Sequence, residues 1–197
     1  MVTVLAVADE ESASVHSARV RAQRPDVVLS AGDLSWSYLE ALVADLGVPA
    51  AYVPGNHEPP GGGAPRGMID VDGRVATVGG VKVAGLGGCV RYNGGAHQYS
   101  QDEYRRRADR LLSEAEGEQV DVLLTHAPPL GLGDEPDPAH VGIEALHTLL
   151  DVLRPAWHLH GHIHPYGLVK PDRHVGGTTI RNVIPWQVVH VDADEED

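Results

Sequence analysis

Residues 26–58 read DVVLSAGDLSWSYLEALVADLGVPAAYVPGNHE, and their pattern indicates the class of fold. Residues 26–30 and 49–53 are short apolar runs typical of strands buried on both faces, and residues 36–46 between them are predicted to form a helix. A strand, a helix and a second strand in this order require a crossover connection, so the two strands are expected to lie parallel in one sheet. The loops that follow these strands should therefore meet at one edge of that sheet.

The same alternation continues outward from this segment. Residues 2–8 predict a preceding strand, and residues 12–24 predict a helix that Pro25 ends, which gives the order βαβαβ. Residues 74–87 alternate around Gly79-Gly80 and predict a hairpin. Further elements are expected as helices at 101–116 and 143–153, strands at 120–125 and 156–160, and short strands within 166–191. We expect two stacked mixed sheets with helices on the outside.

Length and charge narrow the class of protein. The chain has 197 residues, which predicts a single domain over residues 1–197 with an acidic, flexible tail at about 192–197. The net charge of −13 argues against a nucleic-acid or anionic membrane partner, so neither is expected. Cys89 is the single cysteine, which excludes an intramolecular disulfide. The opening apolar run is too short for a signal peptide and no apolar segment has membrane length, so a cytoplasmic protein is expected; the oligomeric state stays open.

Side chains that can bind metal follow five of the predicted strands. The segments are Asp9-Glu10-Glu11, Gly32-Asp33, Gly55-Asn56-His57-Glu58, Thr125-His126 and Gly161-His162-Ile163-His164. Strand ends on one edge of a sheet system converge, so these carboxylate, amide and imidazole groups are expected to form one oxygen and nitrogen donor set, which suits Mn, Fe or Zn. A glycine precedes Asp33, Asn56 and His162, where the chain must turn sharply and let its backbone approach the ions.

These motifs, in this order and with this relative spacing, resemble the calcineurin-like metallophosphoesterases. The resemblance extends from residue 2 to about residue 190, and its most specific parts are the segments that begin at Gly55 and Gly161. It implies an α/β fold: a four-layer α/β/β/α sandwich of two mixed sheets flanked by helices. It also implies a metal-dependent hydrolase of phosphodiesters or phosphomonoesters, with a small phosphorylated substrate.

The resemblance assigns roles to individual residues. It implies two divalent or transition-metal ions, Mn or Fe in preference to Zn, with a hydroxide between them as the nucleophile. Asp33 would bridge the ions. The other ligands would be Asp9 and His164 on the first ion, and Asn56, His126 and His162 on the second. His57 would lie beside the leaving-group oxygen, where it either donates its proton or stabilises the phosphate, and Glu58 could orient it.

The sequence departs from the family pattern at Glu11. The family has Asp-x-His where this chain has Asp9-Glu10-Glu11, so a carboxylate stands in the place of an imidazole. Three interpretations compete: Glu11 coordinates the first ion, water fills the vacancy, or the first site is too weak to stay occupied. The departure also leaves open a second function, a non-catalytic or weakly active metal-binding scaffold that binds a partner protein.

Residues 88–99 form the most distinctive loop outside the metal motifs. Arg91, Tyr92 and His97 lie in a glycine-rich context that could place a guanidinium and a ring over a phosphate substrate, although Arg91 could equally pair with one of the many carboxylates. His158 and His160 alternate in a predicted strand, which favours a hydrogen-bonded core role.

Overall fold

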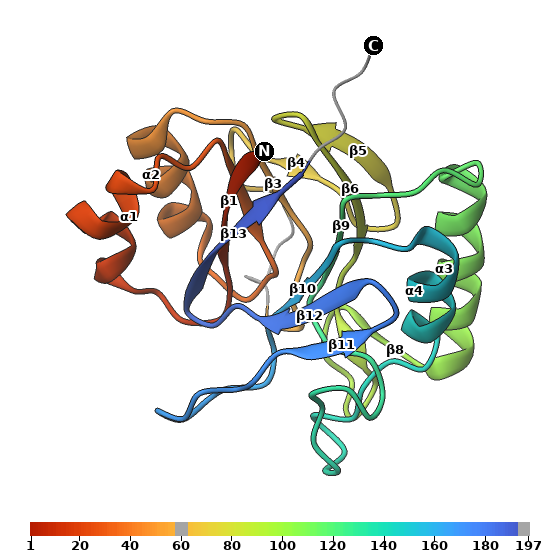
Figure 1. Cartoon of the computed structure of the whole chain (residues 1–197). Helices are drawn as coiled ribbons and strands as arrows, with labels where there is room; N and C mark the ends of the chain where they lie inside the picture. The colour runs from red at the N-terminus through yellow and green to blue at the C-terminus, as the bar shows by residue number, and fades with distance from the viewer. Residues whose placement is uncertain (58–62, 193–197) are drawn as a thin grey trace.

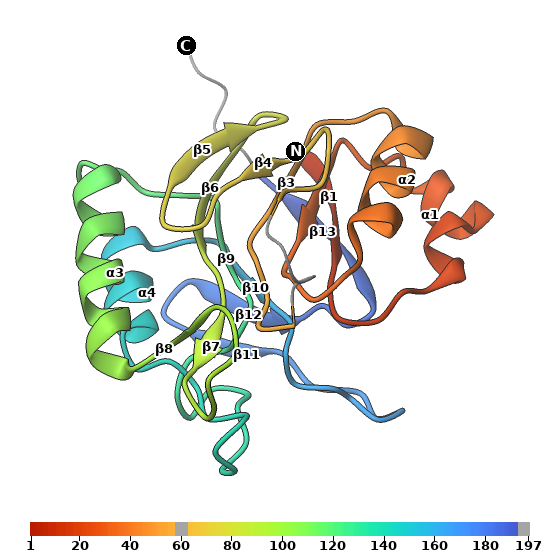
Figure 2. The same ribbon diagram turned by 180° about the vertical axis from the view of Figure 1, so that it is seen from behind.

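The computed structural model consists of two β-sheets packed face to face, each covered by helices on its outer side (Figure 1). It describes residues 1–57 and 63–192. The helices are α1 (Ala18–Ala22), α2 (Trp36–Leu46), α3 (Gln101–Glu114) and α4 (Leu146–Leu153). Figure 2, seen from behind, shows α1 and α2 on one outer side of the sandwich and α3 and α4 on the other. The four-layer sandwich expected from the sequence is confirmed.

The first sheet has the strand order β13-β1-β2-β3-β4. Its strands are β1 (Val2–Val7), β2 (Val27–Ser30), β3 (Ala50–Tyr52), β4 (Ile69–Asp70) and β13 (Trp186–Val191). Strands β1 to β4 pair in parallel, and β13 pairs antiparallel with β1. The parallel βαβαβ unit brings the ends of β1, β2 and β3 to one edge, as the crossover rule requires.

The second sheet has the order β11-β12-β10-β9-β6-β5. Its strands are β5 (Val75–Val78), β6 (Val81–Leu86), β9 (Val122–Thr125), β10 (Trp157–His160), β11 (Arg173–Val175) and β12 (Thr178–Asn182). The predicted hairpin is present, with Gly79 and Gly80 both at positive φ between β5 and β6. A separate parallel pair, β7 (Cys89–Val90) and β8 (Gln98–Tyr99), holds the loop of residues 91–97.

Apolar side chains fill three layers of core. Val4, Leu29 and Leu124 belong to the fully buried cluster between the two sheets. Leu39 of α2 packs on the outer face of the first sheet, and Leu149 of α4 on the outer face of the second. Because both faces of the inner strands are buried, their sequences read as continuous apolar runs and not as alternating ones.

Two helices differ from the expectation. The helix predicted at residues 12–24 is a 3₁₀ turn, η1 (Ala13–His16), followed by the short α1, because Ser17 between them has an extended backbone. The helix expected from residue 143 begins at Leu146. The backbone of Ile143 instead pairs with residues 128–130, donating to Pro128 and accepting from Leu130.

Within residues 1–57 and 63–192, no helix is both long and apolar enough to cross a membrane.

Candidate metal centre

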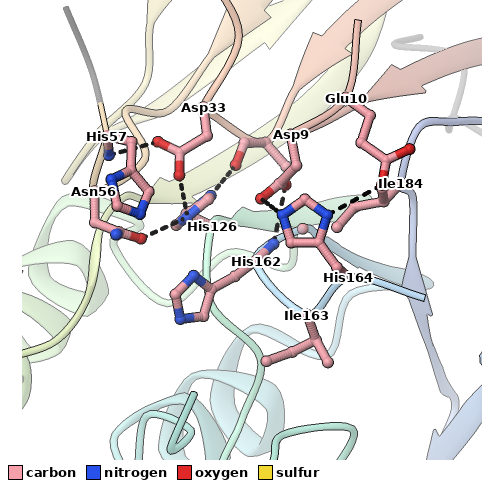
Figure 3. Close-up of polar contacts among 12 residues, drawn as sticks. Asp9, Glu10, Asp33, Asn56, His57, His126, His162, Ile163, His164 and Ile184 are labelled. Atoms are coloured by element: carbon pink, nitrogen blue, oxygen red, sulfur yellow. Dashed lines mark hydrogen bonds and ion pairs between the residues drawn. The ribbon is translucent and has the colours of Figure 1, made fainter. Parts of the chain in front are cut away.

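The ends of β1, β2, β3, β9 and β10 bring the predicted metal ligands other than Glu11 into one cluster (Figure 3). Carboxylate or imidazole atoms of Asp9, Asp33 and His126 all lie within 4.8 Å of one another. Asp9, Asp33 and His162 have φ values of 59°, 58° and 67°, in the left-handed region that side chains other than glycine rarely adopt. Strained backbone at three sites of one cluster is typical of a functional site.

The glycines before the ligands are required by close packing. A Cβ on Gly55 would collide with Asp33 Oδ1, and one on Gly161 would collide with Asp9 Oδ2 and lie 2.8 Å from the Cβ of Ala8. Gly32 has φ +95°, and its Cβ would lie 2.5 Å from the backbone nitrogen of Gly55. The three turns therefore pack against each other and against the carboxylates, and this packing leaves no room for a side chain at the three glycines.

We expect Gly161→Ala to destabilise the metal-free protein by about 1–3 kcal/mol, because the added methyl group overpacks the turn beneath Asp9. Gly177→Ala is the matched control. Its Cβ would meet open space, and Gly→Ala at such a site slightly stabilises a protein through the unfolded chain. Urea unfolding of both variants measures the difference. Equal midpoints would contradict the packing account.

Asp33, Asn56 and His126 form one half of the cluster. The Nδ1–H of buried His126 donates to the carbonyl of Ala31 at 2.7 Å, and Nε2 lies 3.0 Å from Asn56 Oδ1 and 3.3 Å from Asp33 Oδ2. The backbone N–H of His57 donates to Asp33 Oδ1 at 2.7 Å. The carbonyl of Ala31 thus leaves Nε2 of His126 as the nitrogen that faces the cluster.

Asp9 and His164 form the other half, and His162 contacts both halves. The backbone N–H of His162 donates to Asp9 Oδ2 at 3.0 Å, and its ring Nε2–H donates to the carbonyl of Ala139 at 2.8 Å. The ring of His162 lies 4.9 Å from that of His126, centroid to centroid. The Nδ1–H of His164 donates to Glu10 Oε1 at 3.0 Å, while its Nε2 lies 3.8 Å from Asp9 Oδ1. In His126, His162 and His164, one ring nitrogen therefore donates to an oxygen outside the candidate ligand set. The other ring nitrogen does not take part in that hydrogen bond.

The cluster contains two buried carboxylates beside an imidazole that binds a proton. The side chains of Asp9 and Asp33 are 3% and 8% exposed. Burial raises the pKa of Asp9 to about 6. Burial opposes the charge of His126 as well, but Asp33 and Asp9 outweigh it and raise the pKa of His126 to about 9. A proton on His126 thus offsets part of the negative charge of two largely buried carboxylates.

A divalent ion fits this donor set. Deprotonated carboxylates, an amide oxygen and neutral imidazoles are the ligands that Mn, Fe and Zn accept, and the proton on His126 marks where positive charge is stabilised. Burial lowers the pKa of His162 to about 3, so this imidazole is neutral and competent as a ligand at pH 7. Burial, with the charge of Asp33, raises the pKa of Cys89 to about 12, so its thiol is inert.

The two acidic residues after Asp9 face different partners. The Oε1 atom of Glu11 accepts from the hydroxyl of Ser35 at 2.5 Å, at the first turn of α2, where the helix dipole favours a carboxylate. Glu10, which the sequence did not single out, accepts from His164. Glu10 and Glu11 both follow Asp9 in the same turn, so the local sequence could not indicate which of them would contact His164.

The loop of residues 91–97 has a mixed outcome. Asn56 Nδ2 donates to the hydroxyl of Tyr92 at 3.4 Å, so Tyr92 borders the cluster. Arg91 pairs with Glu103 at 2.8 Å and donates to the carbonyl of Gln98, which is the carboxylate pairing considered as the alternative. His97 contributes its backbone, with its carbonyl accepting from Cys89. Glu58 lies outside the described residues.

Three further histidines lie within or near the second sheet and the cluster. His158 and His160 are buried; His158 Nε2 bonds the hydroxyl of Thr125, and His160 Nδ1–H donates to the carbonyl of Gly161, which confirms their core role. The ring of His140 lies 5.3 Å from that of His162. The loop of residues 126–140 brings it there, and no motif marked it.

Comparison with known proteins agrees with this geometry. Residues 10–166 match the family model described as calcineurin-like phosphoesterase. One crystal structure is matched at TM-score 0.66 with 18% identity over 91% of this chain and 89% of that one. The crystal structure of TT1561 of Thermus thermophilus is matched at TM-score 0.54, with 16% identity over 90% and 87% of the two chains. At such identities the two structures show a shared fold.

A curated relative is similar over a shorter segment. It is UPF0046 protein K07C11.7 of Caenorhabditis elegans, 36% identical over 63 residues, which are 31% of this chain. The match spans 22% of the length of that relative.

Proposed function

The chain belongs to the calcineurin-like phosphoesterase family, whose members are generally metal-dependent hydrolases, and from this premise we propose that it hydrolyses a small phosphoric ester with two divalent ions. The observation that carries the proposal is the convergence of carboxylate, amide and imidazole donors on one buried cluster. Its members are Asp9, Asp33, Asn56, His126, His162 and His164. Mn or Fe is proposed in preference to Zn because the donors are oxygen and nitrogen and include no thiolate.

The residues would divide the work as follows. Asp33 would bridge the ions, Asp9 and His164 would hold the first, and Asn56, His126 and His162 would hold the second. When bound, the ions would supply an activated water and neutralise the phosphoryl oxygens. The backbone N–H of His57 donates to Asp33 and its imidazole is exposed, so this ring would lie at the rim of the cluster and could meet the leaving-group oxygen.

A panel of phosphomonoesters and phosphodiesters, including bis(p-nitrophenyl) phosphate, tests the proposal on metal-free protein with added Mn, Zn, Mg or Ni. We expect one to two ions per chain by elemental analysis and turnover that depends on the added metal. Protein that binds no metal and stays inactive with Mn would contradict the proposal.

The second candidate is a metal-binding scaffold that does not turn over substrate. It is favoured by one observation, the replacement of the family histidine by Glu11, whose carboxylate is occupied by Ser35. Metal binding without hydrolysis of any ester in the panel would identify the scaffold.

Proposed substrate contacts by Arg91 and His97 would have to form on substrate binding, and for Arg91 this requires the ion pair with Glu103 to open.

We expect Tyr92→Phe to raise KM about 2- to 10-fold with kcat nearly unchanged, the worth of one hydrogen bond. The hydroxyl of Tyr92 lies beside Asn56 and would face the substrate at that edge. Tyr99→Phe is the control because Tyr99 lies on β8 of the same small sheet and stacks with Arg107 away from the cluster. Steady-state kinetics on the best ester in the panel measures both; a Tyr92 variant with parental KM would remove Tyr92 from the substrate contacts.

A further inference from the structure

The first metal position lacks a ligand that the family pattern supplies. Asp9 is followed by Glu10 and Glu11, and Glu11 occupies the position of the family histidine. Its carboxylate instead accepts a short hydrogen bond from Ser35 at the start of α2. With Glu11 engaged in this way, the ligands proposed for the first ion are Asp9, His164 and the bridging Asp33. Its affinity would then depend on how strongly these three bind.

Glu10 is placed to do this through His164. Its Oε1 accepts from Nδ1 of His164 at 3.0 Å, and the side chains of Glu10 and His164 are 48% and 36% exposed. A carboxylate can only accept, so the proton lies on Nδ1 and the lone pair of a neutral ring lies on Nε2. That nitrogen is the one 3.8 Å from Asp9 Oδ1. Figure 3 shows Glu10, His164 and Asp9 in this order at one end of the cluster.

His164 differs from the other two histidine ligands in what holds its outer nitrogen. His126 and His162 donate to the backbone carbonyls of Ala31 and Ala139, which are neutral. The outer nitrogen of His164 donates to a charged side chain. A carboxylate partner orients the ring and makes the ligating nitrogen a stronger donor, and loss of such a partner typically lowers metal affinity about 10- to 100-fold.

We propose that Glu10 is a positioning residue that compensates for the missing family histidine: it fixes the tautomer and orientation of His164 and so maintains the first metal site. The inference rests on the proposed metal centre. It assigns to Glu10 the importance that the sequence pattern gave to Glu11.

The test is calorimetric titration of the metal-free protein with Mn²⁺. Glu10→Ala is expected to weaken one of two sites about 10- to 100-fold and to spare the other. Glu10→Gln, which keeps an oxygen acceptor but loses the charge, should fall between Glu10→Ala and the parent. Asp109→Ala removes one surface carboxylate on α3 and controls for net charge; it should bind as the parent does. Parental Mn²⁺ binding by Glu10→Ala, or a loss confined to Glu11→Ala, would overturn the inference.

A second measurement needs neither metal nor activity. The ¹⁵N shifts of the His164 ring in the metal-free protein at pH 8 report which nitrogen carries the proton. We expect the Nδ1–H form in the parent and its loss in Glu10→Ala, with the His126 and His162 rings unchanged. The same ring state in parent and variant would overturn the inference, whether or not the parent binds Mn²⁺. Failure of the parent to bind Mn²⁺ would refute the proposed metal centre, but it would not refute the effect of Glu10 on the His164 ring.

Discussion

His57→Ala is expected to lower kcat by roughly 10²- to 10⁴-fold on a phosphoester with a poor leaving group, while bound metal stays at the parental level. The imidazole of His57 is exposed, and its backbone N–H is tied to Asp33, the candidate bridging ligand. Removing the side chain therefore removes a group at the rim of the cluster and leaves the ligand set in place. Turnover and elemental analysis on the same preparation check both parts.

Comparison of leaving groups separates the two roles left open for His57. If the imidazole donates a proton, the loss should shrink for a p-nitrophenyl ester, since p-nitrophenolate departs without protonation, and stay large for an alkyl ester. An equal loss on both esters would indicate stabilisation of the phosphate. His174→Ala, an exposed histidine on β11, is the control. A variant that matches the parent on the alkyl ester would rule out proton donation.

Metal should reverse the pH dependence of stability between about pH 7.5 and 8.5. In the metal-free protein the pKa of His126 is about 9, against 6.5 for an ordinary histidine, because Asp33 and Asp9 outweigh the opposing effect of burial. The folded state binds more protons at His126 than the unfolded state does, so the free energy of unfolding falls as pH rises above about pH 7.5. Below about pH 7 the buried, neutral His158, His160 and His162 oppose this effect, because they gain protons on unfolding. At about 1.4 kcal/mol per pKa unit, the shift of His126 alone corresponds to about 3 kcal/mol, and the part above about pH 7.5 is expected as the falling profile.

With Mn²⁺ in excess the sign changes. A bound ion would replace the proton on His126, and its binding would strengthen as that proton is lost, so the metal is expected to add more stability at pH 8.5 than at pH 7.5. Urea unfolding at several pH values, with chelator or with Mn²⁺, measures both slopes. His126→Gln should flatten the slope of the metal-free protein. A flat profile for the metal-free parent would mean that His126, Asp9 and Asp33 share no proton.

Most of the fold could be predicted because its signals are local. Buried strands at residues 26–30 and 49–53, with a helix between them, carry their own pattern of apolar residues, and the crossover rule orders them in the sheet. The predictions failed where a distant contact overrides local preference. Residue 143 reads as helical, but the backbone of Ile143 is taken by residues 128–130, so α4 starts three residues later.

The chain's own residues likewise place the ligand set: metal-type side chains follow strand ends, and the ends of parallel strands meet. Which neighbours those ligands have depends on the folded turns. At positive φ, Asp9 turns the chain so that Glu10 meets His164, 154 residues away, while Glu11 meets Ser35. The fold likewise decides that Arg91 pairs with Glu103, a contact that its position in the sequence did not distinguish from a substrate contact. Apolar periodicity and strand order can be read from the local sequence. A hydrogen bond between distant side chains depends instead on the backbone conformation of each turn, and the packing of the assembled sheets determines that conformation.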